Sequence, residues 1–165
     1  MPTAVVSRSI AASPPQLWRV VGDPHHLPRW WPRVTRVEGV QGDAFTEVLA
    51  GRSGKVVRAD FEIVDAAPPR RVVWSQQVQG TPFEKVLLSA VTQIDLDDAG
   101  SATEVRIELR QELPGLWGGS VSGVGGVRRG RMFGVARFGS PLVNRAATAT
   151  LQQALDGLAR VFGDA

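Results

Sequence analysis

Residues 140–162 read SPLVNRAATATLQQALDGLARVF, and this pattern predicts a long helix near the C-terminus. Ser140 and Pro141 are typical of a helix start, and Gly163 is typical of a helix end. Large apolar side chains recur at helical spacing in the second half, at Leu151, Leu155, Leu158 and Phe162. On the same face, the first half carries small or polar residues, namely Asn144 and Ala147 or Thr148. We therefore predict tight packing along the second half and a cavity beside the first half, unless nearby tryptophans fill that space.

The chain before this helix is dominated by alternating polar and apolar residues, which predict β-strands. We expect strands at residues 3–10, 34–40, 44–50, 56–64, 71–78, 83–96 and 103–113. The alternation is clearest at 56–64, where one side carries Val57, Ala59, Phe61 and Ile63. At 83–96, the apolar side is expected to include Val86 and Leu88. One-sided strands form a sheet with one face in water and one face covered, and the C-terminal helix is the available cover.

Two short helices are predicted between the first strand and the remaining strands. Ser13 is a suitable N-cap, Pro14 suits the first helical position, and Gln16 completes a capping box. The second helix is expected from Pro24 to Trp31, because the proline after it stops further extension.

Length and composition indicate one globular domain that covers residues 1–165. The absence of cysteine excludes disulfides and thiolate metal sites. No run approaches the roughly 20 apolar residues of a membrane span, and residues 1–10 lack the hydrophobic core of a signal peptide. We therefore expect a cytoplasmic protein.

Residues 113–139 form a segment rich in glycine and arginine, and connections of this length are uncommon unless they are functional. We interpret it as a lid-like insertion that is helical in part, at about residues 127–138. Arg128, Arg129 and Arg131 lie beside apolar residues, a mixture that suits an anionic surface, either a membrane or an acidic partner. A solvated lid without a partner is the alternative. The chain has no nucleic-acid-binding motif, so nucleic acid is not an expected partner.

Three local motifs resemble those of a known family. They are SPPQLW at residues 13–18, DPHHLPRWWP at residues 23–32 and APPRRV at residues 67–72. Together with the order of elements, they resemble the START-like superfamily, also called SRPBCC or the birch-pollen-allergen fold. The chain is most similar to its bacterial polyketide cyclase/dehydrase and lipid-transport branch. The glycine- and arginine-rich segment is longer than the usual connection in this family.

The resemblance covers most of the chain and implies an α+β helix-grip fold. In this fold a curved antiparallel seven-stranded sheet surrounds a long C-terminal helix, and two short helices follow the first strand. The family includes carriers of lipids and other hydrophobic ligands as well as aromatase/cyclases, so the fold alone does not identify the activity.

The ligand-binding candidates come from the elements that surround the cavity in this fold. The aromatic members are Trp30, Trp31, Phe61 and Trp74. The polar members are Thr92, Asn144 and Thr148, with Gln76 and Gln93 as weaker candidates. Ligand pockets combine a large apolar area with a few polar groups, although the aromatic residues could instead be ordinary core residues.

Catalytic chemistry is not clearly encoded in the sequence. Adjacent histidines on a helix, such as His25 and His26, do not converge on one ion, so no metal site is expected. No nucleotide loop or cofactor motif is present, and we expect no cofactor. Asp60, Glu62, Glu104 and Glu108 are expected on the wet face of the sheet, whereas the facing of Glu47 and Glu84 is not determined.

Three functional hypotheses follow from these patterns. The first is a carrier or sensor for a hydrophobic, lipid- or polyketide-like small molecule, and the second is a polyketide aromatase/cyclase. The third is a peripheral membrane-associated factor. An ionisable group inside the pocket would favour the enzyme, and the sequence does not clearly identify such a group. The oligomeric state is not determined by the sequence.

Overall fold

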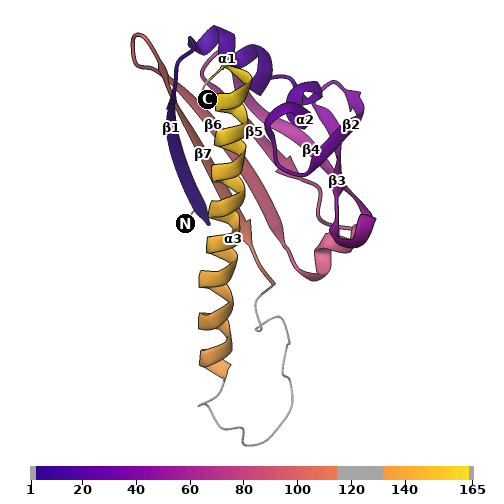
Figure 1. The fold of residues 1–165 in the computed structure, drawn as a ribbon. Coiled ribbons are helices and arrows are strands. Elements are labelled where there is room, and N and C mark those ends of the chain that lie inside the picture. The colour runs from indigo at the N-terminus through magenta and orange to yellow at the C-terminus, as the bar shows by residue number, and fades with distance from the viewer. Residues whose placement is uncertain (1–2, 115–131, 164–165) are drawn as a thin grey trace, which may run out of the picture.

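A seven-stranded antiparallel sheet forms the body of the protein (Figure 1). The computed structural model describes residues 3–114 and 132–163, with the backbone alone for residues 132–141. The spatial order of the strands is β1-β7-β6-β5-β4-β3-β2. The strands are β1 (Ala4–Ile10), β2 (Val34–Gln41), β3 (Ala44–Ala50), β4 (Val56–Ala67), β5 (Arg71–Gln76), β6 (Ser89–Asp98) and β7 (Thr103–Glu112). The predicted α+β helix-grip fold, with short helices after the first strand, is confirmed.

The connection from β1 to β2 is helical, as predicted. Helix α1 (Pro14–Val21) begins at Ser13, whose hydroxyl accepts from the Gln16 backbone while the Gln16 side chain accepts from the Ser13 backbone. A 3₁₀ turn, η1 (Pro24–His26), then leads into the single turn of α2 (Leu27–Trp30). The predicted second helix is therefore present as two consecutive short pieces.

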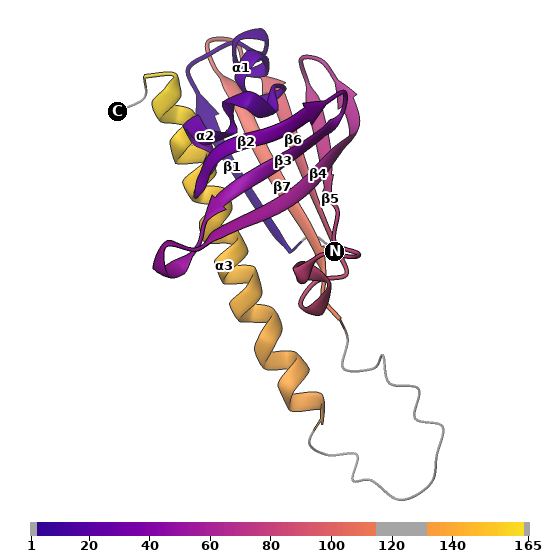
Figure 2. The ribbon, with the colours of Figure 1, turned by 90° about the vertical axis from the view of Figure 1, so that its right-hand side faces the viewer.

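Helix α3 (Met132–Val161) runs along one side of the curved sheet, packs against β1 and α2, and extends past the sheet edge in its first turns (Figures 1 and 2). Its buried residues are Ala147, Leu151, Ala154, Leu155, Leu158 and Ala159. The close approach to α2 requires Gly157, because an added Cβ would lie 2.3 Å from the Trp30 carbonyl oxygen. The second half of the helix is therefore tightly packed, as expected.

The predicted start of this helix was wrong. Ser140 and Pro141 lie inside α3, which begins at Met132. A proline inside a helix removes one backbone hydrogen bond and usually kinks the helix, so it marks a start only when the preceding residues cannot be helical. The sequence also predicted a helix at about residues 127–138, and the described part of this range, from Met132 onward, is helical.

The strand predicted at residues 83–96 was also wrong in its first part. Residues Pro82–Lys85 form the 3₁₀ turn η3, and the Thr81 hydroxyl caps it by accepting from the Phe83 backbone N–H. Proline after a capping threonine favours this turn over a strand. As a result, the expected alternation of buried and exposed side chains is reversed before β6: Leu87 is buried, whereas Val86 and Leu88 are exposed.

The outer face of the sheet carries a row of ion pairs across β5, β6 and β7. Asp95 accepts from Arg71 at 2.7 Å, and Glu108 accepts from Arg106 at 2.8 Å and from Arg110. Glu108 was expected on this wet face, and it does lie there. However, its side chain is only 5% exposed because the two arginines cover it.

Among the described residues, no helix has the length and apolar character needed to cross a membrane.

Candidate functional site

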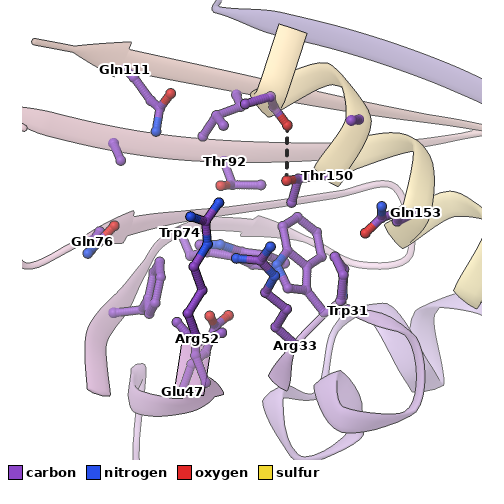
Figure 3. Close-up of a pocket in the computed structure, with 17 residues that line it drawn as sticks. Trp31, Arg33, Glu47, Arg52, Trp74, Gln76, Thr92, Gln111, Thr150 and Gln153 are labelled. Atoms are coloured by element: carbon purple, nitrogen blue, oxygen red, sulfur yellow. Dashed lines mark hydrogen bonds between the residues drawn. The ribbon is translucent and has the colours of Figure 1, made fainter. Parts of the chain in front are cut away.

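A cavity of about 590 Å³ lies between the concave face of the sheet and the flank of α3 (Figure 3). Strands β3, β4, β5, β6 and β7 supply its floor, and residues 146–153 of α3 supply one wall. The helix contributes small or polar side chains here, namely Ala146, Ala149, Thr150 and Gln153. Small side chains at these positions leave the space beside the helix open.

The aromatic wall of the cavity is continuous with the hydrophobic core. Trp31, Phe61 and Trp74 line the cavity, and the rings of Trp31 and Trp74 meet edge to face at 5.7 Å. Trp30 is buried, and its ring packs edge to face against Trp31 at 5.2 Å, but it does not line the cavity. Trp30 therefore acts as a support for the cavity wall. Such edge-to-face contacts hold the rings in defined orientations.

Glu47 is the acidic group of the cavity. It lies on β3, two residues after Phe45 and two residues before Leu49. Because side chains two positions apart on a strand point to the same face, Glu47 points inward as these two residues do. The residue is 3% exposed, and among the described residues no group forms a hydrogen bond or ion pair with its carboxyl. Burial raises the pKa of Glu47 from 4.5 to about 8, because the charged form is poorly solvated there.

Two arginines face the same space from the turns at its mouth. Arg33 precedes β2, and Arg52 lies in the 3₁₀ turn η2 (Arg52–Gly54) between β3 and β4. Figure 3 shows both side chains extending into the space bordered by Trp74, Thr92 and Thr150. Within the described part of the chain neither guanidinium has an acidic partner. The mouth of the cavity is therefore positively charged.

Several uncharged polar groups complete the lining. The side-chain nitrogen of Gln76 is buried without a hydrogen-bond partner among the described residues. Thr92 is buried and lines the cavity. Gln111 on β7 is half-buried and lines it too. Thr150 is already partnered, because its hydroxyl donates to the Ala146 carbonyl oxygen at 3.1 Å. The cavity lining thus combines apolar and polar side chains in similar numbers.

The predicted ligand-binding residues are only partly brought together. Trp31, Phe61, Trp74 and Thr92 line the cavity, and so does Gln76 among the weaker candidates. Thr148 lies instead in a separate shallow groove beside β1, with its hydroxyl donating to the Asn144 carbonyl oxygen.

Asn144 and Gln93 also lie away from the cavity. Asn144 is exposed and does not line it, and Gln93 donates its side-chain amide to Asp95 on the outer face. The helix prediction failed because the cavity borders a face of α3 more than a quarter turn from the Leu151–Leu158 stripe.

Other candidate groups lie away from the cavity. Glu84 is exposed, and its carboxylate accepts from the Gly80 backbone N–H at 2.9 Å, which stabilises a turn. His25 pairs with Asp23, and no group of acidic or histidine side chains among the described residues could hold a metal ion. Arg128, Arg129 and Arg131 lie outside the described residues, so their predicted surface contact stays a prediction.

The sequence reasoning did not single out Arg33 and Arg52, and it left Glu47 undecided. A signal for Glu47 was present, because Phe45 and Leu49 flank it at the period of a strand with one buried face. No comparable signal exists for the arginines, since both lie in turns, where a charged residue is ordinary.

Comparison with known proteins agrees with this architecture. The family model described as polyketide cyclase/dehydrase and lipid transport matches residues 1–163. Among curated proteins, no sequence matches this chain.

Several solved structures share the fold at low sequence identity. A conserved protein from Geobacillus kaustophilus is 17% identical with a TM-score of 0.69, covering 96% of this chain and 93% of that one. A START superfamily protein from Mycobacterium smegmatis is 16% identical with a TM-score of 0.65, covering 96% of each. CalU16 from Micromonospora echinospora is 16% identical with a TM-score of 0.59, covering 97% of this chain and 73% of that one.

The match over almost the whole chain places this protein in the polyketide cyclase/dehydrase and lipid-transport family.

Proposed function

We propose that this protein binds a hydrophobic small molecule in the cavity beneath α3 and acts as a carrier or sensor. The observation that carries the proposal is the cavity itself, about 590 Å³ in volume, with aromatic walls and unused polar groups. Ligand pockets commonly span about 300–1,000 Å³ and combine these two features. The family description, which includes lipid transport, supports the same class of ligand.

A cavity-filling substitution tests the proposal. Ala149 lines the cavity from α3, so Ala149→Trp should occupy it, whereas Asn144→Trp adds a tryptophan at an equally exposed position of α3 that does not line the cavity. The probe is N-phenyl-1-naphthylamine, an uncharged dye that fluoresces in apolar surroundings. We expect the wild type and Asn144→Trp to bind the dye, and Ala149→Trp to lose at least tenfold in affinity. Equal binding by all three proteins would place the dye elsewhere and refute the cavity as its site.

Native mass spectrometry of the freshly purified wild type provides an independent measurement. A hydrophobic molecule retained at one copy per chain in the wild type, and lost in Ala149→Trp, supports a carrier.

A second candidate function is an aromatase/cyclase, and Glu47 is the specific observation that favours it. General acid–base groups work best when their pKa lies near the working pH, and burial raises the pKa of Glu47 to about 8. In its charged form, Glu47 would remove a proton from the carbon next to a ligand carbonyl, leaving the electron pair as an enolate. The same carboxylic acid would then return a proton to carbon.

Deuterium exchange tests this second candidate directly. The wild type is mixed with 2-decanone in D₂O, and deuterium at the α-carbons is followed by NMR against buffer alone. We expect exchange that rises with pH up to about 8 and is absent in Glu47→Gln. Exchange at the buffer rate in the wild type would refute acid–base catalysis on simple ketones while leaving the binding proposal intact.

A further inference from the structure

The two arginines at the cavity mouth are held by the backbone in a defined relation to each other. The Ala50 backbone N–H, at the end of β3, donates to the Arg33 carbonyl oxygen at 2.9 Å. Arg52 follows two residues later in the same hairpin, whose Gly51 N–H donates to the Lys55 carbonyl oxygen at 2.7 Å. The turns that carry Arg33 and Arg52 are therefore joined directly.

The backbone at this mouth is strained in two places. Arg33 has φ 67° and Ser53, next to Arg52, has φ 61°, and these are the positive φ values found at non-glycine residues in the described part of the chain. The left-handed conformation costs such residues on the order of 1 kcal/mol. Strain of this kind persists where the surrounding structure determines the backbone, and it occurs here in each of the two joined turns.

The charges of the cavity are unbalanced. Its ionisable lining residues are Arg33, Arg52 and Glu47, and neither arginine has an acidic partner among the described residues. Glu47 does not neutralise them, because burial raises its pKa to about 8 and keeps the carboxyl largely uncharged near neutral pH. Both arginines are exposed, so water solvates them in the free protein, and an anion between them would pair with two positive charges at once.

We propose that the ligand of this cavity is an amphipathic carboxylic acid whose carboxylate lies at Arg33 and Arg52 and whose apolar body contacts Trp31 and Trp74. This inference rests on the proposed binding function and adds the chemical class and orientation of the ligand. Guanidinium groups match the two oxygens of a carboxylate with paired N–H donors.

Isothermal titration calorimetry near neutral pH, with decanoate and decanol as matched probes, tests the inference. The two probes share their alkyl chain and differ in charge. We expect the wild type to bind decanoate roughly tenfold or more tightly than decanol, because the charge-assisted hydrogen bonds are made only with the acid. In Arg33→Gln/Arg52→Gln, decanoate affinity should fall to that of decanol, while decanol affinity stays unchanged.

A matched control variant removes two positive charges outside the cavity. Arg19 and Arg160 are exposed and lie outside the cavity, so Arg19→Gln/Arg160→Gln should keep the wild-type preference for decanoate. Circular dichroism and thermal melts establish that each variant is folded before titration.

The outcomes separate the inference from the proposed function. Equal affinity of the wild type for decanol and decanoate would overturn the inference and leave hydrophobic binding standing. Retention of the preference in the double cavity variant would also overturn it. Decyl phosphate is the third probe, and tenfold tighter binding of it than of decanoate would replace the carboxylate with a phosphate head group. Failure of all three probes to bind would count against the binding function itself.

Discussion

Replacing Glu47 with glutamine should make the protein more stable at neutral and alkaline pH. The pKa of Glu47 is about 8 in the folded chain because of burial, against an ordinary value of 4.5. At pH values between these two pKa values, the folded chain holds one more proton than the unfolded chain. The free energy of unfolding therefore falls as pH rises, by about 1.4 kcal/mol per pH unit. From 4.5 to 7 the penalty reaches roughly 3 kcal/mol, and from 4.5 to 8 roughly 5 kcal/mol, after which it stays constant.

The penalty depends on what surrounds Glu47. Its partners across the sheet are Val37 on β2 and Ala59 on β4, which carry no charge. The residues on either side of Val37 and Ala59 along the strands are charged, but their side chains point to the opposite, outer face of the sheet. There Arg36 and Arg58 contact Glu38, and Asp60 accepts a hydrogen bond from Thr46. The wall supplied by α3 has no ionisable side chain, which leaves Arg33 and Arg52 as the charges that share the cavity.

The assay is urea unfolding of the wild type and Glu47→Gln at pH 5, 7 and 8.5, followed by tryptophan fluorescence. The difference in unfolding free energy between the two proteins cancels the groups that titrate equally in both. We expect that difference to be small at pH 5 and to favour the variant by about 3 kcal/mol at pH 7. Glu108→Gln is the matched control, since Glu108 is equally buried but paired with Arg106 and Arg110. It should destabilise the protein, because the arginines lose their partner. A difference that does not change between pH 5 and 8.5 would refute the assigned burial of an unpaired acid.

Substitutions at three further positions test the packing and the cap of α1. Gly157→Ala should lower the unfolding free energy by at least about 2 kcal/mol, because its Cβ would collide with the Trp30 carbonyl oxygen; a thermal melt within a degree of the wild type would contradict the close approach of α2 and α3. Leu158→Ala removes a fully buried side chain and should cost roughly 2–5 kcal/mol in urea unfolding; a cost well below 1 kcal/mol would indicate a site that is not packed. Ser13→Ala removes the α1 cap and should cost about 1 kcal/mol, whereas Ser13→Asp, which retains a capping oxygen, should cost little.

The elements of the fold were largely predictable because they depend on neighbours along the chain. The capping box at Ser13, the alternation at 56–64 and the helical repeat through Leu158 were all found where expected. Errors arose where two local signals competed. Pro141 suggested a helix start although the helix continues through it, and Thr81 with Pro82 favoured a 3₁₀ turn over the alternation that follows.

The cavity was predictable in part, and its chemistry much less so. Trp31, Phe61, Trp74 and Thr92 were identified from the family resemblance, and they do line the cavity. Asn144 and Thr148 were placed on the cavity side by extending the buried stripe of α3. The helix in fact presents its small residues, Ala146 and Ala149, to the cavity on a different face.

The sequence by itself therefore determined the strands, the helices and the need for a helix to cover one face of the sheet. These follow from periodicities of two and about 3.6 residues, which are local properties of the chain. Only the tertiary structure decided that Arg33, Glu47, Arg52 and Gln76 face one cavity, because sheet curvature brings together residues that no local pattern relates. It also decided that Glu47 holds its proton near neutral pH, since desolvation depends on everything that surrounds a group in space.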